Sequence, residues 1–225
     1  MIDADLLTEA GPSLDDGVRS NDAAGAYLNA SLNNGERPDL DVETTRLHQR
    51  SSDKGLGHDE LSLVLGYVRD LCHHLTRFHQ GGLWHKDIKP SNLLVSEGRL
   101  RVVDFGLVTP LESALTLTTH GTEFFRDPEL VRLALAGKRV QDVDGVKFDL
   151  YSAGAVLYSM VENSFPAHGS LSSISKEAPE GLRWIVRRSM ADVDKRYGSA
   201  QEMLLDVEAL LGAPDPYKVP LAALP

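Results

Sequence analysis

The sequence predicts an α+β fold that is predominantly helical and carries one short β-hairpin near its middle. One apolar pattern with helical spacing, one segment that would be apolar nearly all round a helix, and one alternating pattern support this prediction. The helical patterns lie at residues 59–78 and 149–161, and the alternating pattern lies at residues 93–103. With 225 residues, the chain is long enough for one or two domains with a sizeable core.

The composition is that of an ordinary globular protein, with 42% hydrophobic and 25% charged residues. The net charge of −10 argues against a general surface for nucleic acid or anionic membranes. The single cysteine, Cys72, excludes an intramolecular disulfide and fits a reducing compartment. The longest apolar run, near residues 153–161, is too short to span a membrane, and the acidic N-terminal residues do not resemble a signal peptide. We therefore expect a cytoplasmic protein.

The N-terminal part of the chain carries weaker patterns. Residues 1–20 suggest the end of a strand at Leu6–Thr8, a break at Gly11–Pro12 and a helix capped by Ser13. Residues 21–57 are polar and show no clean period, so we interpret them as a loosely structured connection or insertion.

A long amphipathic helix is predicted over residues 59–78. Its apolar face consists of Leu61, Val64, Leu65, Val68, Leu71, Leu75 and Phe78. Cys72 lies beside this face, where a small core residue is expected. His73, His74 and His79 lie on or just past the helix and, together with Asp70, leave open a metal site. Solvated side chains are the expected interpretation of these histidines.

The central stretch, residues 83–106, holds the polar side chains Asp87, Lys89, Asn92 and Asp104. Between the last two, a hairpin is predicted from two short apolar runs around the turn at residues 96–98. Because a hairpin brings its ends together, we expect Asn92 and Asp104 to be neighbours, with Asp87 close by. Mg²⁺ prefers one or two protein oxygens together with phosphate oxygens. The stretch therefore predicts a site for magnesium and phosphates.

This stretch resembles the catalytic loop and metal-binding triplet of eukaryotic-type (Hanks-type) serine/threonine protein kinases. The family pattern is H-R-D-x-K-P-x-N followed by D-F-G. Here residues 85–92 read HKDIKPSN, and residues 104–106 read DFG. The alternative, an acidic surface loop beside an amphipathic hairpin, is disfavoured because both motifs occur together with a hairpin between them. The resemblance implies a kinase-like C-terminal lobe over residues 58–212.

The resemblance also implies ATP and Mg²⁺ as cofactors and phosphoryl transfer to Ser or Thr of a protein. Asp87 would accept or orient the hydroxyl proton, and Lys89 would steady the transferring phosphoryl group. Asn92 and Asp104 would hold Mg²⁺. Lys89 and Thr122 resemble the serine/threonine-directed branch of the family.

Other positions follow from the same resemblance. Residues 9–11, with Glu9 and Gly11, would form the hinge that holds adenine, although an arbitrary turn explains them equally well. Leu94 would form the floor beneath the adenine ring. His85 and Phe105 would stack in the core under the site.

The segment after residue 106 continues the resemblance. Gly121, Thr122, Pro128 and Glu129 match the pattern G-T-x-x-[YF]-x-A-P-E, with Asp127 at the usual alanine position. Phe125 stands at the aromatic position. Residues 107–120 would be the activation loop. Its candidate phosphorylation sites are Thr109, Ser113, Thr116, Thr118 and Thr119, although an unregulated surface loop remains an equal alternative.

The C-terminal third predicts a buried central helix from Asp149 and two further helices. Asp149 matches the family aspartate that accepts hydrogen bonds from the catalytic-loop backbone, although a simple helix cap is the alternative. Arg196 would form a buried bidentate ion pair with Glu129, or would be an exposed arginine. Residues 213–225 are rich in proline and predict an extended tail.

The sequence also departs from the family pattern. It contains no G-x-G-x-x-G, and the lysine before Lys86 is Lys54, in a polar stretch that predicts no strand. We therefore expect the N-terminal lobe to be absent from this chain and the chain alone to have little activity. Lys86 replaces the usual arginine beside the catalytic aspartate. Because lysine binds phosphate only as a point charge, this replacement argues against activation through a phosphorylated loop.

Two other functions remain as alternatives. A non-catalytic kinase-like binding module is weakened because Asp87, Lys89, Asn92 and Asp104 are all present. A small-molecule phosphotransferase is less favoured because the Lys89–Pro90 pair and the segment at residues 121–129 resemble protein kinases. We also consider a partner chain that covers the apolar face left by the missing lobe.

Overall fold

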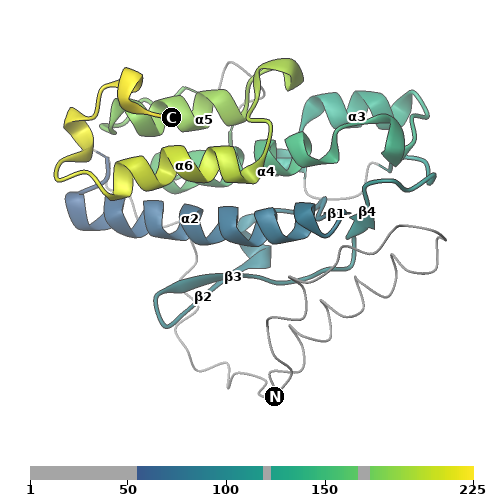
Figure 1. The fold of residues 1–225 in the computed structure, drawn as a ribbon, viewed down its shortest axis with the longest axis horizontal. Coiled ribbons are helices and arrows are strands. Elements are labelled where there is room, and N and C mark those ends of the chain that lie inside the picture. The colour runs from purple at the N-terminus through teal and green to yellow at the C-terminus, as the bar shows by residue number, and fades with distance from the viewer. Residues whose placement is uncertain (1–54, 119–122, 167–172) are drawn as a thin grey trace. The chain divides into compact units, whose positions relative to one another are not determined.

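A computed structural model describes residues 55–118, 123–166 and 173–225 of the chain. The expected hinge at residues 9–11, nearly all of the polar connection at 21–57, and Thr119, Gly121 and Thr122 lie outside the described residues. The described part is mainly helical, with two small two-stranded sheets, and so confirms the predicted fold class (Figure 1).

The long helix α2 (His58–Gln80) forms as the apolar periodicity predicts. At its start, the Glu60 carboxylate accepts a hydrogen bond from the Gly57 amide at 2.8 Å, which satisfies a donor outside the first turn. Its apolar face is buried, including Cys72. Burial raises the pKa of the Cys72 thiol to about 12, so Cys72 is a core residue, as expected.

The central helix α4 (Gly145–Glu162) begins four residues before the predicted start at Asp149. The Asp144 carboxylate caps it by accepting from the Lys147 amide at 3.4 Å, and Asn163 ends it in a left-handed conformation. Nearly all of α4 is buried, as its apolar composition predicts. Asp149 therefore lies within the first turns of a core helix and does not cap it.

Helices α5 (Glu180–Ser189) and α6 (Ala200–Leu211) complete the core. Helix α2 packs between α6 on one side and the hairpin of β2 (Leu93–Ser96) and β3 (Arg99–Val102) on the other (Figure 1). Helix α4 packs against both α2 and α5. Gly154 makes the α4–α5 contact close, because a Cβ there would lie 2.4 Å from the Cβ of Ser189.

The hairpin has the expected turn and register. Leu93 pairs with Val102 and Ser96 pairs with Arg99, while Glu97 and Gly98 in the turn both have positive φ angles. The second sheet pairs β1 (Leu83–Trp84) with β4 (Thr109–Pro110) and closes the loop that contains the motif residues.

The short helix α3 (Pro128–Leu135) follows the 3₁₀ turn η4 (Glu123–Phe125). Two further 3₁₀ turns, η5 (Val140–Asp142) and η7 (Val193–Lys195), flank α4 and α5 in the sequence. Another, η3 (Pro90–Asn92), lies in the catalytic loop. In the described part of the chain, no helix is long and apolar enough to cross a membrane.

The C-terminal segment differs from the expected extended tail. It forms the 3₁₀ turns η8 (Pro216–Lys218) and η9 (Leu221–Ala223). The Tyr217 hydroxyl donates to the Leu56 carbonyl at 3.2 Å, and Tyr217, Val219 and Leu224 pack against the core. Pro216 is buried and starts η8, and the Asp215 carboxylate caps this turn by accepting from the Tyr217 amide at 3.1 Å.

One buried carboxylate joins α2 to the hairpin. Asp70, 2% exposed, accepts hydrogen bonds from Arg99 Nε at 2.8 Å, Arg99 Nη2 at 3.0 Å and the Leu100 amide at 3.1 Å. Burial by itself would raise the pKa of Asp70, but the hydrogen bonds from Arg99, Leu100 and Arg69 outweigh it and lower the pKa below 3.8. The carboxylate is therefore ionised and bonded in the folded state.

We expect Asp70→Asn to reduce the free energy of unfolding at pH 7 by about 1–3 kcal/mol, the usual cost of weakening a buried hydrogen bond to a charged group. Because the folded pKa lies below the unfolded value, this stabilisation is complete above that value and is lost as the pH falls below it. Urea titrations between pH 7 and pH 2.5 measure both effects. Asp142→Asn, in an exposed pair with Arg139, is the matched control. Equal losses for both variants would contradict the role of Asp70.

Candidate active site

The candidate site is built on the loop between β1 and β2, which carries the HKDIKPSN motif. Asp149 on α4 fixes the backbone of this loop. Its carboxylate accepts from the His85 amide and from the Lys86 amide, each at 2.9 Å. Asp149 is 1% exposed, so these bonds are shielded from water. The predicted contact between Asp149 and the catalytic-loop backbone is present.

His79, at the end of α2, supports the same carboxylate. Its Nε2 lies 3.0 Å from Asp149 Oδ2, and its side chain is 9% exposed. The expectation of a solvated histidine is therefore wrong for His79. It is also wrong for His74, which is half-buried and bonds to the Leu100 carbonyl at 3.2 Å. Among the described residues, no cluster of His, Cys, Asp and Glu could hold a metal ion, so the alternative metal site at these histidines has no support.

The side chains of the motif converge on Asp87. Its Oδ2 lies 2.8 Å from Lys89 Nζ and 2.9 Å from Asn92 Nδ2. The Asn92 amide also donates to the Asp87 carbonyl at 2.9 Å, which fixes the side-chain rotamer. Asp87 Oδ1 accepts no hydrogen bond from the described residues. One carboxylate oxygen is thus held by the loop, and the other is left for an incoming donor.

His85 lies in the core under this loop. It is fully buried, and its ring packs edge-on against Phe78 and Phe105 with centroids 5.4 and 5.8 Å away. This is the packing that the resemblance implied. Burial lowers the pKa of His85, although Asp149, Asp87 and Asp104 oppose the shift. Its Nδ1 accepts from the Asp87 amide at 3.3 Å, which places the proton of the neutral ring on Nε2.

Asn92 directly precedes the first strand of the hairpin, β2, and Asp104 follows two residues after the end of the second strand, β3. The Val103 amide donates to the Asn92 carbonyl at 2.9 Å, so the two strands stay paired up to the residue before Asp104. Asp104 has φ +64° and is exposed, and its Oδ1 accepts from the Gly106 amide at 3.2 Å. Leu94 lies on β2, half-buried. The hairpin therefore keeps Asn92 and Asp104 at the same end, as predicted.

Lys86 occupies a different environment from the rest of the loop. Its Nζ lies 5.3 Å from the Trp84 ring centroid and 3.4 Å from Thr109 Oγ1. Burial lowers the pKa of Lys86, with Asp149 opposing the shift. Thr109 itself is buried and donates to the Leu107 carbonyl at 3.0 Å. Of the candidate phosphorylation sites among the described residues, Thr109 is therefore the one whose hydroxyl is closed off by the fold.

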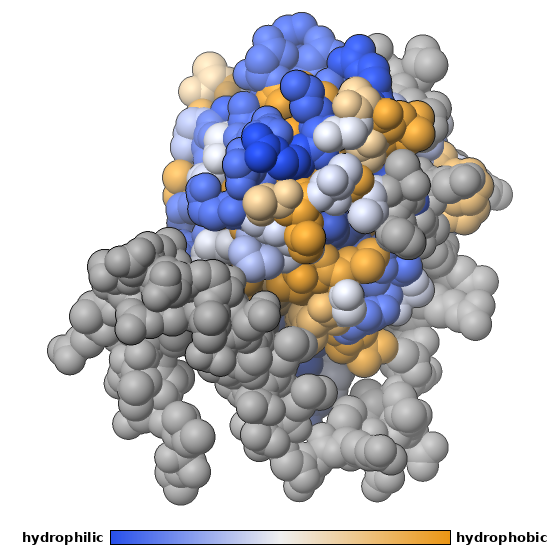
Figure 2. Space-filling view, turned by 90° about the vertical axis from the view of Figure 1, so that its right-hand side faces the viewer, coloured by the Kyte–Doolittle hydropathy of each residue, from blue (hydrophilic) through white to orange (hydrophobic). Residues whose placement is uncertain are grey.

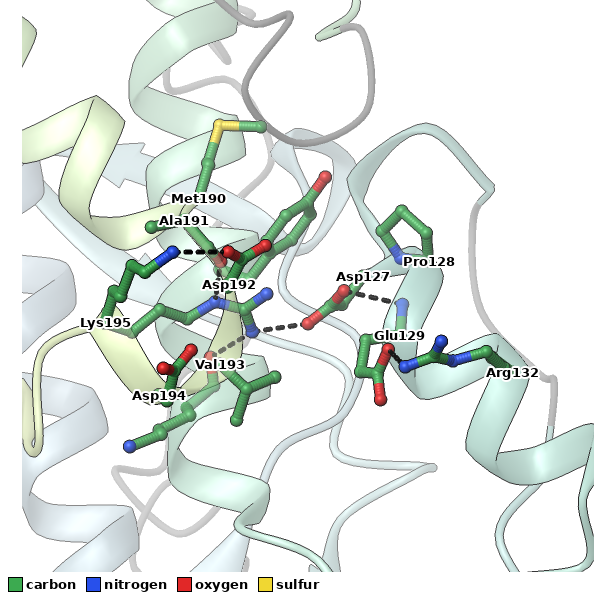
Figure 3. Close-up of a pocket in the computed structure, with 13 residues that line it drawn as sticks. Asp127, Pro128, Glu129, Arg132, Met190, Ala191, Asp192, Val193, Asp194 and Lys195 are labelled. Atoms are coloured by element: carbon green, nitrogen blue, oxygen red, sulfur yellow. Dashed lines mark hydrogen bonds and ion pairs between the residues drawn. The ribbon is translucent and has the colours of Figure 1, made fainter.

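The expected ion pair between Arg196 and Glu129 is wrong in its partner. Arg196 pairs with Asp127, and both side chains are almost fully buried, whereas Glu129 pairs with the exposed Arg132 (Figure 3). Asp127 also caps α3 through a 2.8 Å bond from the Glu129 amide. Asp127 stands where the family has alanine. Its carboxylate, at the N-cap of α3, therefore forms the ion pair with Arg196 in place of the Glu129 carboxylate.

The surroundings of Arg196 complete its burial. Its Nε donates to the Ala191 carbonyl at 2.7 Å and its Nη1 to the Lys147 carbonyl at 3.2 Å, and the guanidinium lies 4.9 Å from the Tyr151 ring centroid. A cavity of about 720 Å³ opens beside it. The charged side chains around this cavity comprise four acidic and four basic residues, most of them joined in ion pairs (Figure 3).

A family model described as "Protein kinase domain" matches residues 42–210, well over half of the chain. The chain therefore belongs to the protein kinase family, and its curated relatives are of the serine/threonine type. The serine/threonine-protein kinase PrkC of Bacillus subtilis is 28% identical over 171 residues, which cover 67% of this chain and 25% of that protein. The CBL-interacting serine/threonine-protein kinase 20 of Arabidopsis thaliana is 37% identical over 107 residues, which cover 45% and 23%.

The chain spans about a quarter of the length of these curated relatives. Among solved structures, the PK-1 kinase of the Cydia pomonella granulovirus resembles it with a TM-score of 0.53 at 21% identity. The match covers 64% of this chain and 57% of that one. This likeness shows the fold of a protein kinase.

We expect Asp127→Ala to lower the free energy of unfolding by about 3–5 kcal/mol, because it leaves Arg196 buried without its counter-ion. Glu129→Ala removes an exposed pair and should cost less than about 1 kcal/mol. Urea denaturation followed by circular dichroism measures both. A larger loss for Glu129→Ala than for Asp127→Ala would restore the pairing expected from the sequence.

Proposed function

We propose that this chain carries the catalytic loop and the metal-binding side of a serine/threonine protein kinase that transfers the γ-phosphoryl group of ATP to a protein hydroxyl. One observation carries the proposal: Asp87 is held on one oxygen by Lys89 and Asn92, while Asp149 fixes the backbone next to it. Such an arrangement leaves a carboxylate oxygen in a fixed position for the proton of a Ser or Thr hydroxyl.

Each motif side chain has a role in this proposal. Asp87 Oδ1 orients the substrate hydroxyl and accepts its proton as the oxygen attacks phosphorus. Lys89, whose ammonium lies 2.8 Å from Asp87 Oδ2, is placed to offset negative charge on the transferring group. Phosphoryl transfer relies mainly on positioning and electrostatics, so a loop that is fixed before substrate binds is what the reaction requires.

The donor set at the hairpin end fits Mg²⁺. Asn92 uses its amide nitrogen to hold Asp87, so its amide oxygen faces away and accepts no hydrogen bond from the described residues. Asp104 keeps one carboxylate oxygen that likewise has no partner in the described ranges. Two oxygen donors without a nitrogen or sulfur ligand suit a magnesium ion that completes its coordination with water and phosphate oxygens. When bound, Mg²⁺ would neutralise phosphate charge.

The adenine contacts remain proposals. Leu94 would lie under the ring, and Glu9 and Gly11 would hold its edge from a hinge.

A cytoplasmic location is consistent with the single buried cysteine. The protein substrate would supply a Ser or Thr hydroxyl.

A second polypeptide that covers exposed apolar surface is a further proposed partner. Phe124 and Phe165 stack with centroids 4.3 Å apart and are 47% and 55% exposed. Figure 2 shows hydrophobic surface beside a hydrophilic region on the face it views.

The alternative function is a kinase-like module that binds partners without catalysis. The four motif side chains count against it, because a binding surface has no chemical need for a preset carboxylate, an ammonium and two free oxygens. A small-molecule phosphotransferase is the less favoured third candidate.

We expect Mg²⁺-ATP to raise the melting temperature of the chain, by about 5–10 °C at a concentration 100-fold above Kd. Asp104→Asn should abolish the shift without unfolding the chain, because asparagine tolerates the left-handed backbone at φ +64°. Asp87→Asn should keep the shift, since the variant removes the base and leaves both metal ligands. Differential scanning fluorimetry with and without EDTA measures this. A wild-type chain that shows no shift would favour the non-catalytic module.

We expect slow transfer of radiolabelled phosphate to a generic Ser/Thr substrate by the 225-residue chain, several orders of magnitude below the roughly 1–100 s⁻¹ of typical kinases. Its sequence has no G-x-G-x-x-G motif, the pattern with which kinases position the phosphates. Asp87→Asn should lower the remaining rate by a further factor of about 10²–10⁴. Normal turnover by the chain alone would contradict the expected weakness, and an unchanged rate in Asp87→Asn would contradict the role of Asp87.

A further inference from the structure

A group of arginines lies on the side of α2 that faces the hairpin. Arg69 and Arg77 come from α2, and Arg99 and Arg101 come from β3, where alternate residues face outward. Helix α2 and strand β3 are packed together (Figure 1). We call these four residues the arginine patch. It stands out because the chain as a whole carries a net charge of −10.

Hydrogen bonds of two α2 side chains, Asp70 and His74, join the part of α2 that carries Arg69 and Arg77 to the strand that carries Arg99 and Arg101. Arg69 and Arg99 share one carboxylate oxygen, Asp70 Oδ1, at 3.1 and 3.0 Å. Burial lowers the pKa of His74, and the charges of Arg77 and Arg101 lower it further, whereas the bond to Leu100 and the charge of Asp70 oppose the shift. His74 comes three residues before Arg77 on α2 and bonds to the carbonyl of Leu100, the residue before Arg101.

The patch carries excess positive charge. Asp70 is the carboxylate within it and is already bonded to Arg69 and Arg99. The side chains of Arg77 and Arg101 are exposed, and neither side chain forms an ion pair or a hydrogen bond with another described residue. Exposed arginines without a carboxylate partner repel one another and leave their planar donor groups free. Such groups suit bidentate binding of carboxylates.

We propose that the arginine patch is a docking site for an acidic segment of a partner protein, with Arg77 and Arg101 binding its carboxylates. The helix positions of Arg69 and Arg77 are eight residues apart, a rise of about 12 Å, which matches three or four residues of an extended peptide. None of the four arginines is one of the proposed phosphoryl-transfer residues, although Arg101 pairs across the hairpin with Leu94.

Two other polyanions fit the patch less well. Nucleic acid binding usually adds aromatic side chains for base stacking, but Tyr67, Phe78 and Trp84 near these elements are at most 2% exposed. Anionic membranes favour exposed apolar side chains beside the cations. None of the large hydrophobic residues exposed in the described part of the chain lies on α2 or the hairpin. The overall negative charge also repels both extended polyanions.

The experiment measures binding of fluorescein-labelled hexaglutamate to the full chain by fluorescence anisotropy at low and physiological salt. We expect saturable binding that weakens with salt. Hexaglutamine is the uncharged probe, and it should not bind. The variant R77Q/R101Q should weaken hexaglutamate binding by about tenfold or more, since charged hydrogen bonds are lost at two positions. Neither residue supports the fold through a contact, so melting temperatures should stay close to wild type.

The matched control is R187Q/K195Q, which removes the same charge from exposed ion pairs on α5 and η7. It should leave hexaglutamate binding within about twofold, because general electrostatics alone change little at physiological salt. Absence of hexaglutamate binding, or equal weakening by both double variants, would overturn the proposal. So would tighter binding of a 12-nucleotide thymidine strand or of phosphatidylserine vesicles through Arg77 and Arg101.

Discussion

The hydrogen bonds that Asp149 accepts are the constraint on which the site depends. One buried carboxylate on the central helix holds two consecutive amides of the loop that carries the proposed base. His79 supports that carboxylate from the end of α2. Because the carboxylate is buried, each bond it makes is costly to lose and resists competition from water. The loop is therefore fixed to the core by its backbone, which leaves its side chains free for chemistry.

Much of this arrangement could be predicted from the sequence. Apolar periodicity located α2, and turn residues located the hairpin, since both are local signals. The spacing of Asp87, Asn92 and Asp104 predicted which side chains share one end of the hairpin. His79 was missed, because its role comes from a contact across 70 positions of sequence. Its place at the helix end just before the motif was the available signal.

Two of the wrong predictions, the partner of Arg196 and the C-terminal segment, have a common physical origin. The pairing of Arg196 with Asp127 turns on which of two nearby carboxylates can both cap a helix and reach a buried cation, and sequence spacing does not resolve that choice. In the C-terminal segment, the prolines favoured an extended chain, whereas the segment forms two 3₁₀ turns and packs Tyr217, Val219 and Leu224 against the core. Both outcomes were decided by tertiary packing and not by local preference.

The Asp70 anchor has a consequence for the far end of the hairpin. Arg99 and Leu100 begin β3 next to the turn, while Asn92 and Asp104 flank the opposite end. The turn end of the hairpin is thus fixed to α2, and the opposite end carries the proposed metal ligands. Four pairs of residues join β2 to β3 along the length of the hairpin. The ion pair of Asp70 with Arg99 therefore ties the turn end of the hairpin to α2, and the ladder carries that restraint along the strands toward the proposed metal ligands.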